Sequence, residues 1–459
     1  MPFLYFYDIC RYRKKICSYS ISKDPRKGED LKLSVVGLGY IGLPTAVMFA
    51  NSGMNVHGVD VNPNVIDMIR SKRIHLHEPG MEKALKDAID TGTFTVSMQP
   101  QEADAFIIAV PTPIGPGKTA DLSQVVKAAE MLVPILKAGD LVVLESTVPP
   151  KTVESLLLPV LRQTNLVIGE QLFVCNSPER VLPGRLFHEL KHNDRIVGGV
   201  TPLSAQKCAE LYERIVQGTI HITDTITAEM VKLMENTYRD VNIALANELA
   251  RVAEEVGFDI WEAIELANSH PRVHIHSPGP GVGGHCIAVD PWFIFEKAPK
   301  AARLIELSRI TNDDVPHLVS NRIREMVRDI HKPVITLLGV AFKGDIDDIR
   351  ESPSLVIINE LRTNGYQLKI YDPYVKQDMA EKAPTLHEAV TGSDCIVLLT
   401  DHAIFKNIDF DQIGRLMRSR RIIDTRNMVD LNRLRLAGFL CQKIGTQIAH
   451  VAAHRDEGR

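Results

Sequence analysis

Long apolar stretches, paired cysteine motifs and an excess of basic charge are all missing from this sequence of 459 residues. No run reaches the ~18 apolar residues that a membrane-spanning helix needs, which argues against a transmembrane protein. The net charge of -4 lacks the basic surplus of nucleic-acid-binding proteins. The seven cysteines are odd in number and form no CxxC motif. This argues against a disulfide framework and a zinc ribbon and favours a reducing cytoplasm.

The rest of the composition describes a globular protein with several domains. Hydrophobic residues make up 45% and charged residues 24% of the chain, which is too long for a single core. Residues 1–30 differ, because aromatic residues come first and a basic run follows. A secretory signal has the opposite order, so we expect a disordered N-terminal extension rather than a signal.

The stretch "LKLSVVGLGYIGLP" predicts a dinucleotide site. An apolar strand runs into Gly37-x-Gly39-x-x-Gly42 and a helix, and a second strand ends in Asp60. The first glycine permits the tight turn, the second lets a pyrophosphate approach, and the third lets the helix pack on the strand. An acid about twenty residues on binds ribose hydroxyls and repels a 2′-phosphate. The pattern indicates NAD rather than NADP.

Two further predicted strands, 105–113 and 140–150, both run into Thr and Pro. Ligands of open α/β sheets bind at the carboxyl ends of the strands. Thr112 and Thr147 are therefore candidates for the lining of the cofactor cleft, although each taken alone is an ordinary strand-to-loop threonine.

The second half of the chain repeats the α/β pattern without a GxGxxG motif. Strands are predicted within 333–344, 366–373, 393–402 and 420–427. The fold class is therefore α/β, with two Rossmann-like doubly wound domains. The second domain carries cations near strand or turn ends, at Lys343, Arg350 and Arg426. Such cations can hold phosphates, or they can be solvated surface residues.

A long helix is predicted between the two halves. Residues 225–257 have apolar residues at helical spacing and contain no glycine or proline before Gly257. Lys232 and Asn236 stand four residues apart on one face, with Arg239 near it. Taken alone, these three residues are consistent with a merely polar helix face.

The stretch "PGPGVGGHCIAVDPWF", residues 278–293, poses the question of what Cys286 does. A metal site has little support, because no second cysteine lies nearby and no ligand set is evident. A buried inert thiol is common but does not need the glycines that precede it. In a chain with an NAD domain, a third interpretation is a nucleophile that attacks an aldehyde.

At this point the sequence resembles a known family, the UDP-glucose/GDP-mannose dehydrogenases, over about residues 31–430. The resemblance is carried by eight blocks in order, "GLGYIGLPTA", "AVPTP", "ESTVPP", "PERVLPG", "AEMVKLMENTYRDVNIALANELA", "ANSHPRVHI", "PGPGVGGHCIAVDPWF" and "AFKGDIDDIRESP". The cysteine block is most similar to the N-acetylmannosamine branch.

The resemblance implies a role for each matching residue. The implied catalytic residues are Cys286 as nucleophile, Lys232 as proton donor or acceptor, Asn236 for the oxyanion or its water, and Glu179 or Asp290 for hydrolysis. The implied NAD contacts are Gly37, Gly39, Tyr40, Ile41, Gly42, Asp60, Thr112 and Thr147. The implied substrate contacts are Arg180, Val181, Lys232, Asn236, Arg239, His270, Arg272, Gly283, Phe342, Lys343, Arg350 and Arg426. No metal is implied.

The resemblance also implies a reaction and a domain plan. The expected reaction is NAD-dependent four-electron oxidation of C6 of a UDP-sugar, with UDP-N-acetyl-D-mannosamine first and UDP-N-acetylglucosamine or UDP-glucose as alternatives. An inactive UDP-sugar-binding homologue and a two-electron dehydrogenase are the rivals. The expected protein is a cytoplasmic homodimer for polysaccharide biosynthesis, with no nucleic-acid or membrane partner. Its expected parts are an extension 1–30, an NAD-binding domain 31–222, a helical dimerisation domain 223–325 and a UDP-sugar-binding domain 326–459.

Two positions depart from the family pattern. Arg426 stands where relatives often have lysine, and the two are not equivalent at a bidentate phosphate site. The segment "HLHEPGM", residues 75–81, differs from the usual "HIxEPDL" but keeps Glu78.

Overall fold

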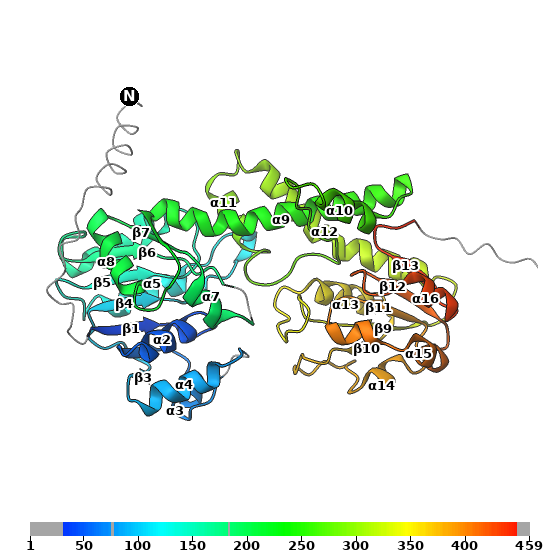
Figure 1. Ribbon diagram of the computed structural model, residues 1–459, viewed down its shortest axis with the longest axis horizontal. Helices are drawn as coiled ribbons and strands as arrows, with labels where there is room; N and C mark the ends of the chain where they lie inside the picture. The colour runs from blue at the N-terminus through cyan, green and yellow to red at the C-terminus, as the bar shows by residue number, and fades with distance from the viewer. Residues whose placement is uncertain (1–30, 75–77, 182–183, 448–459) are drawn as a thin grey trace, which may run out of the picture. The chain divides into compact units, whose positions relative to one another are not determined.

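The computed structural model describes residues 31–74, 78–181 and 184–447. The predicted extension 1–30 and the end of the chain from 448 lie outside these residues. The described chain forms two compact units that divide in the sequence between Met234 and Glu235 (Figure 1). Each unit is built on a largely parallel sheet with helices on both faces, which confirms the predicted fold class.

In the described part of the first unit, eight strands form one sheet in the order β3-β2-β1-β4-β5-β6-β7-β8. Their bounds are β1 Lys32–Val36, β2 Asn55–Val59, β3 Phe94–Ser97, β4 Ala105–Ile108, β5 Leu141–Leu144, β6 Phe173–Asn176, β7 Arg195–Gly199 and β8 Ile220–Asp224. Only β6 and β7 pair antiparallel among them. The strand order reverses beside β1, and this is where open α/β sheets bind their ligands.

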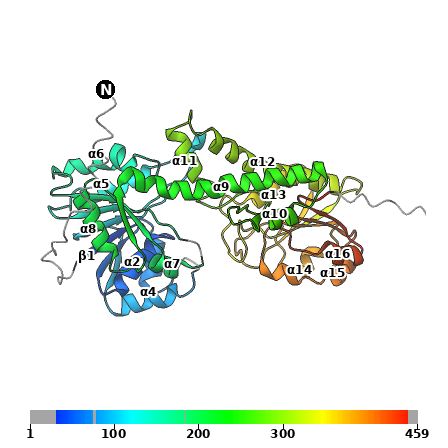
Figure 2. The ribbon, with the colours of Figure 1, turned by 45° about the horizontal axis from the view of Figure 1, so that its top comes forward.

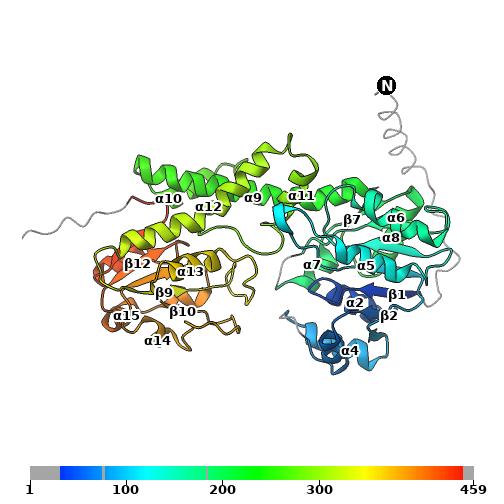
Figure 3. The same cartoon turned by 180° about the vertical axis from the view of Figure 1, so that it is seen from behind.

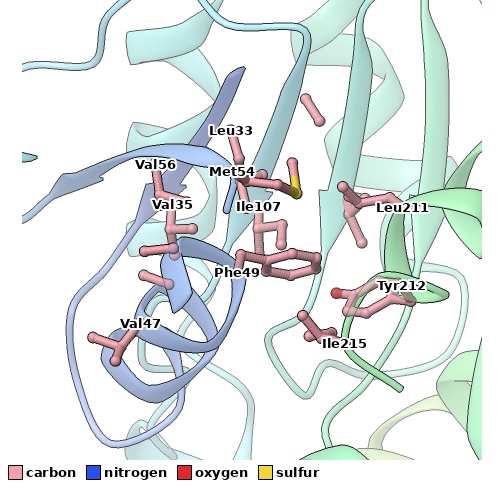
Figure 4. Close-up of a cluster of buried hydrophobic side chains, with 14 of the residues drawn as sticks. Leu33, Val35, Val47, Phe49, Met54, Val56, Ile107, Leu211, Tyr212 and Ile215 are labelled. Atoms are coloured by element: carbon pink, nitrogen blue, oxygen red, sulfur yellow. The ribbon is translucent and has the colours of Figure 1, made fainter. Parts of the chain in front are cut away.

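Alternate residues of these strands point to two separate cores. On one face, Leu33 and Val35 of β1 pack with Phe49 and with Leu211 and Tyr212 (Figure 4). On the other face, the intervening strand residues pack on a second set of helices. The helices of this unit are α2 Gly42–Asn51, α3 Pro63–Arg70, α4 Met81–Asp90, α5 Ser123–Leu132, α6 Leu158–Leu161, α7 Leu186–His192 and α8 Pro202–Tyr212, with short turns η1 Pro116–Lys118, η2 Val153–Leu157 and η3 Arg162–Thr164.

The second unit contains a five-stranded parallel sheet in the order β10-β9-β11-β12-β13 among its described residues. The bounds are β9 Val334–Leu338, β10 Gln367–Tyr371, β11 Cys395–Leu398, β12 Arg421–Asp424 and β13 Leu440–Lys443. Its helices are α10 Ile260–Asn268, α11 Asp290–Lys297, α12 Arg303–Met326, α13 Pro353–Thr363, α14 Leu386–Val390, α15 Phe410–Leu416 and α16 Leu431–Leu436, with the turn η4 Ala403–Asn407. Helices α12 and α13 lie against each other (Figure 3).

The predicted long helix is confirmed as α9, Thr225–Val256 (Figure 2). It ends where Gly257 adopts a left-handed φ of 95°, a conformation that glycine accepts without strain. Residues up to Met234 belong to the first unit and those from Glu235 to the second. No helix in the described part of the chain is both long and apolar enough to span a bilayer.

Candidate active site

The glycine turn after β1 has the geometry that a pyrophosphate site requires. A Cβ on Gly42 would lie 1.8 Å from the carbonyl oxygen of Gly37, so only glycine lets α2 start this close to the strand. A Cβ on Gly39, by contrast, would meet no atom within 4 Å. Ile41, the residue before α2, gives the helix no side-chain cap. The first amides of α2 are thus offered to an anion, as in dinucleotide sites.

Asp60 lies level with this turn, because Val36 is in register with Val59. Its carboxylate accepts the N–H of Leu38 at 2.9 Å and the N–H of Asn62 at 2.9 Å. These bonds hold a half-buried carboxylate beside Gly39. The residues present therefore fit NAD, with the glycine turn for the pyrophosphate and Asp60 for the ribose hydroxyls.

Thr112 and Thr147 come together at the carboxyl ends of β4 and β5. The Thr112 hydroxyl donates to the carbonyl oxygen of Thr147 at 2.6 Å. Both residues are half-buried. β4 is also in register with β1, with Ile108 opposite Val36. The two threonines therefore lie at the same carboxyl ends of the strands as the glycine turn.

Glu78 is a buried carboxylate whose function was not assigned from the sequence. It accepts the N–H groups of Gly184 and Leu186, both at 2.8 Å. Its oxygen also accepts the Tyr40 hydroxyl at 3.3 Å. Glu78 therefore ties the predicted NAD contact Tyr40 to the backbone that follows Arg180 and Val181.

Glu179 is buried, and its pKa is shifted, as is common for catalytic acids and bases. Burial raises its pKa above 4.5, while the nearby charges of Lys232 and Arg195 oppose the rise. Its carboxylate accepts the N–H of Val181 at 2.7 Å. The neighbouring Arg180 donates to the carbonyl oxygen of Asp194 at 2.9 Å.

A buried ionic network below Glu179 was missed from the sequence. Arg195 pairs with Glu145 and donates to the Ser177 hydroxyl at 2.9 Å and carbonyl at 3.0 Å. The Tyr212 hydroxyl also donates to Glu145 at 3.1 Å. The network fixes Ser177, which follows β6 and lies two residues before Glu179.

Helix α9 presents Lys232 and Asn236 one turn apart, and both are buried. One turn earlier, Glu229 accepts the N–H of Lys151 at 2.6 Å and of Val153 at 2.8 Å, so the helix anchors the loop that follows Thr147. Burial raises the pKa of Glu229 to about 7. Glu229 was not identified from the sequence, although its i, i+3 spacing from Lys232 could have indicated it.

In the second unit, Asn236 lies at the centre of a polar cluster. Its amide nitrogen donates to Asp290, and its amide oxygen accepts from Arg239. Three of the predicted site residues are therefore brought together. Asp290 is buried and begins α11, and its N–H donates to the carbonyl oxygen of Cys286 at 2.8 Å.

The glycine-rich loop explains how Cys286 is held. A Cβ on Gly283 would lie 2.6 Å from the Glu351 carbonyl oxygen and 2.8 Å from the Phe342 Cβ. Gly284 packs on the Phe342 ring and donates its N–H to the carbonyl oxygen of Arg350 at 3.1 Å. The glycines thus admit a second loop, and the Cys286 side chain remains exposed.

Two of the three predicted cations of the second domain are already oriented by partners. Arg350 makes a bidentate pair with Asp348, at 2.8 and 2.6 Å. Arg426 donates through Nε to the carbonyl oxygen of Leu399 at 3.0 Å, which leaves its outer guanidinium nitrogens beside Gly279. Lys343 is exposed.

His270 and Arg272 occupy an exposed segment just after α10. The Arg272 N–H donates to Nδ1 of His270 at 3.3 Å. The structure does not bring them into the Asn236 cluster through any described hydrogen bond. Nor do any three described His, Cys, Asp or Glu side chains converge in an arrangement that could hold a metal ion.

Three family models cover most of the chain. The NAD-binding domain of the UDP-glucose/GDP-mannose dehydrogenase family matches residues 31–216, its central domain matches 226–314, and its UDP-binding domain matches 336–431.

The chain belongs to this family.

Relatives of known name agree with this membership. The chain is 45% identical over 423 residues to a UDP-N-acetyl-D-mannosamine dehydrogenase of Methanococcus maripaludis, covering 90% of this chain and 97% of that protein. It is 44% identical to an NDP-N-acetyl-D-galactosaminuronic acid dehydrogenase of Ralstonia solanacearum, covering 88% and 97%. The solved UDP-D-ManNAc dehydrogenase of Pyrococcus horikoshii is 41% identical, with a TM-score of 0.86 over 90% of this chain and 99% of that one.

Family membership confirms the cofactor prediction. The turn after β1 lies in the NAD-binding domain of a nucleotide-sugar dehydrogenase, and the loops around Phe342 lie in its UDP-binding domain. This dehydrogenase is therefore NAD-dependent, and its second sheet lies in the UDP-binding domain of the family.

Proposed function

We propose that this dehydrogenase oxidises C6 of UDP-N-acetyl-D-mannosamine to the uronate, through a covalent intermediate on Cys286. The observation that supports the covalent step is the exposure of the Cys286 side chain. Of the five cysteines among the described residues, Cys286 is the exposed one. Burial raises the pKa of Cys395 and of Cys441 to about 12, so these thiols are poor nucleophiles.

Each of the chain's own residues has a part in the proposed reaction. NAD, when bound, accepts a hydride from C6 in each of two successive oxidations. Lys232 takes the alcohol proton, giving the aldehyde. The Cys286 sulfur bonds to the aldehyde carbon, and the oxygen is protonated to a thiohemiacetal. Loss of a second hydride and a proton leaves a thioester, and water releases the acid and the thiol.

The remaining groups are proposed to orient this chemistry. Asn236 binds the C6 oxygen, since its amide is fixed by Asp290 and Arg239. Glu179 or Asp290 orders the hydrolytic water. Buried groups with restricted side chains are suited to this because little reorganisation accompanies the reaction. His270, Arg272, Arg180 and Val181 are proposed substrate contacts, and Phe342, Lys343, Arg350 and Arg426 are proposed to hold the UDP.

The substrate assignment is supported by the relatives named for UDP-N-acetyl-D-mannosamine. The Ralstonia relative makes an N-acetylgalactosamine nucleotide a second candidate to include in the assay. UDP-N-acetylglucosamine and UDP-glucose are the further alternatives. A part in polysaccharide biosynthesis and a cytoplasmic location are included in the proposal.

The test is the NADH formed per UDP-sugar consumed, measured for each candidate sugar. We expect about two NADH from UDP-N-acetyl-D-mannosamine, because a four-electron oxidation transfers two hydrides. Two NADH from a different sugar would overturn the substrate only. One NADH would contradict the covalent route, and none from any sugar would favour a UDP-sugar-binding homologue.

Cys286→Ser tests the covalent step directly. Steady-state turnover should be lost while UDP-sugar binding is retained, since the side chain is exposed and its size is conserved. Cys441→Ser, at a thiol in β13, is the matched control and should keep turnover. Uronate production at the wild-type rate by the Cys286 variant would overturn the covalent route.

We also propose that the protein is a homodimer, and that its domain borders follow the predicted division at 222 and 325. Helix α9 exposes Tyr238, Leu245 and Val252 at spacings of seven, so all three lie on one face. Exposed apolar faces of this kind mark contacts between proteins. Leu245→Glu should convert a dimer to a monomer in light scattering.

A further inference from the structure

The loop of residues 340–345, which follows β9, carries Phe342 and Lys343. The proposed function assigns both residues to UDP, and the inference below rests on that assignment. We propose that Asp372 and His402 form a clamp that holds this loop in its UDP-binding conformation. His402 is then a positioning residue for nucleotide recognition, although it is fully buried and contacts no substrate itself.

The clamp holds the start of the loop through Asp372. One carboxylate oxygen, Oδ2, accepts the N–H of Val340 at 2.7 Å and of Ala341 at 3.2 Å. Leu338 is in register with Tyr371 of β10, which places Asp372 level with the first residues of the loop.

The clamp holds the end of the loop through His402. The N–H of Asp345 donates to Nδ1 of His402 at 2.9 Å. In return, the Asp345 carboxylate accepts the N–H of Ala403 at 2.9 Å. Asp345 has a left-handed φ of 60°, an unfavourable conformation for a residue with a side chain, so the loop end needs this support.

The two halves of the clamp are joined to each other. Nε2 of His402 lies 3.0 Å from Oδ2 of Asp372. Because Nδ1 accepts from a backbone N–H, the ring proton must be on Nε2, which donates to Asp372. The neutral ring thus bridges the two ends of the loop. Its Nδ1 accepts from Asp345 at the loop end, and its Nε2 donates to Asp372, which binds the loop start.

The segment that precedes His402 completes the support. The Thr400 hydroxyl donates to the carbonyl oxygen of Ala341 at 2.7 Å. A Cβ on Gly344 would lie 2.5 Å from the Asp401 carbonyl oxygen, so the loop rests directly on this segment. The adjacent Leu399 carbonyl orients Arg426, so one segment positions both Lys343 and Arg426.

Two substitutions of His402 separate positioning from plain stability. His402→Asn keeps an acceptor near the place of Nδ1, and His402→Gln keeps a donor near the place of Nε2 while losing that acceptor. UDP affinity is measured by calorimetric titration on the full chain, with KM and kcat for the UDP-sugar. We expect His402→Gln to weaken UDP binding by about tenfold, since one hydrogen bond contributes about 1.4 kcal/mol. We expect His402→Asn to remain within about threefold, because the bond that it loses, from Nε2 to Asp372, does not reach the loop and Asp372 keeps its backbone N–H donors. We expect kcat to change less than KM.

Further variants keep the result decisive. If the two His402 variants change UDP affinity equally, or if neither changes it, the clamp is overturned. If His402→Gln does not fold, Asp345→Ala replaces it, because it loses the acceptor for Ala403, whereas Asp345→Asn keeps it. Asp345→Ala should then weaken UDP binding and Asp345→Asn should not. Lys343→Ala tests the assignment of this loop to UDP, on which the clamp rests. An unchanged UDP affinity in this variant would remove the loop from the UDP site, whatever the His402 variants do.

Discussion

The two sheets of this dehydrogenase use the same device in opposite ways. In each, a turn leaves the first central strand and an aspartate ends the strand beside it. Leu38 donates its N–H to Asp60 at 2.9 Å, and Val340 donates its N–H to Asp372 at 2.7 Å. The topological position of the carboxylate is therefore the same in both units.

The difference lies in how many hydrogen bonds each carboxylate already accepts within the protein. Asp60 is half-buried and accepts two backbone N–H groups. Asp372 is only 4% exposed and accepts four backbone N–H groups and the His402 ring. An acid at a strand end is thus available to a ribose only where its oxygens remain accessible. Where they are saturated, the same acid supports the fold.

Of the substitutions that distinguish Asp372 from Asp60, Asp372→Ala should have the largest effect, and that effect is on stability. Loss of a buried, multiply bonded carboxylate leaves several N–H groups and His402 unpaired. We expect the second unit to lose on the order of 3–5 kcal/mol of unfolding free energy, because each buried donor left unpaired costs about 1–3 kcal/mol. Chemical denaturation of the full chain, followed by a probe in the second unit, measures this. A change below about 1 kcal/mol would mean that Asp372 is not structural.

Asp60→Ala should affect the ligand rather than the fold. Water can replace the half-exposed carboxylate, so stability should stay within about 1 kcal/mol. NAD affinity should fall on the order of ten- to a hundredfold, because hydrogen bonds from ribose to a charged group contribute about 1.5–3 kcal/mol. Titration of NAD by fluorescence tests this, with UDP affinity as the unaffected control. Wild-type NAD binding would remove the contrast between the two aspartates.

The smallest expected effect is in pH dependence, where two carboxylates shift in opposite directions. Burial raises the pKa of Glu179. As a base Glu179 must be ionised, so hydrolysis of the thioester should slow as pH falls through that raised pKa, by about tenfold per unit below it. The acid limb should therefore lie above pH 4.5.

Asp372 supplies the internal control for this profile. Burial alone would raise its pKa, but the hydrogen bonds from His402 and the backbone outweigh it and lower the pKa well below 3.8. Its stabilising contribution is present above the unfolded pKa and is lost only as pH falls through the lowered value. UDP affinity should therefore be flat across the window in which turnover falls. An acid limb at or below pH 4.5, seen in single-turnover release of the acid, would exclude Glu179 as the base.

Local patterns predicted much of this molecule. The glycine turn, Asp60 and the helix from Thr225 were predictable because each depends on residues close in the sequence. Strands β3, β6, β7, β8 and β13 were not predicted. In β7, for example, Arg195 begins the strand and two glycines end it, and only its pairing with β6 and β8 makes it a strand.

The missed site residues share a physical cause. Glu145, Arg195, Glu78 and His402 are polar residues that the fold buries against partners far along the chain. A charged residue in a sequence is expected at the surface unless its partner is known, and the partner of Glu78 lies 106 positions away. For Asp372, the sequence predicted the strand that precedes the acid. Its partner His402 could not be identified from spacing.

The order of strands in the first sheet also bears on how the protein is made. After β3 the chain crosses to the other side of β1, and from β4 to β8 each new strand is added beside its predecessor. A polypeptide leaving the ribosome N-terminus first thus always finds the edge it needs already formed. Synthesis and assembly can proceed in step, and the unpaired edges at any moment are β3 on one side and the most recently added strand on the other.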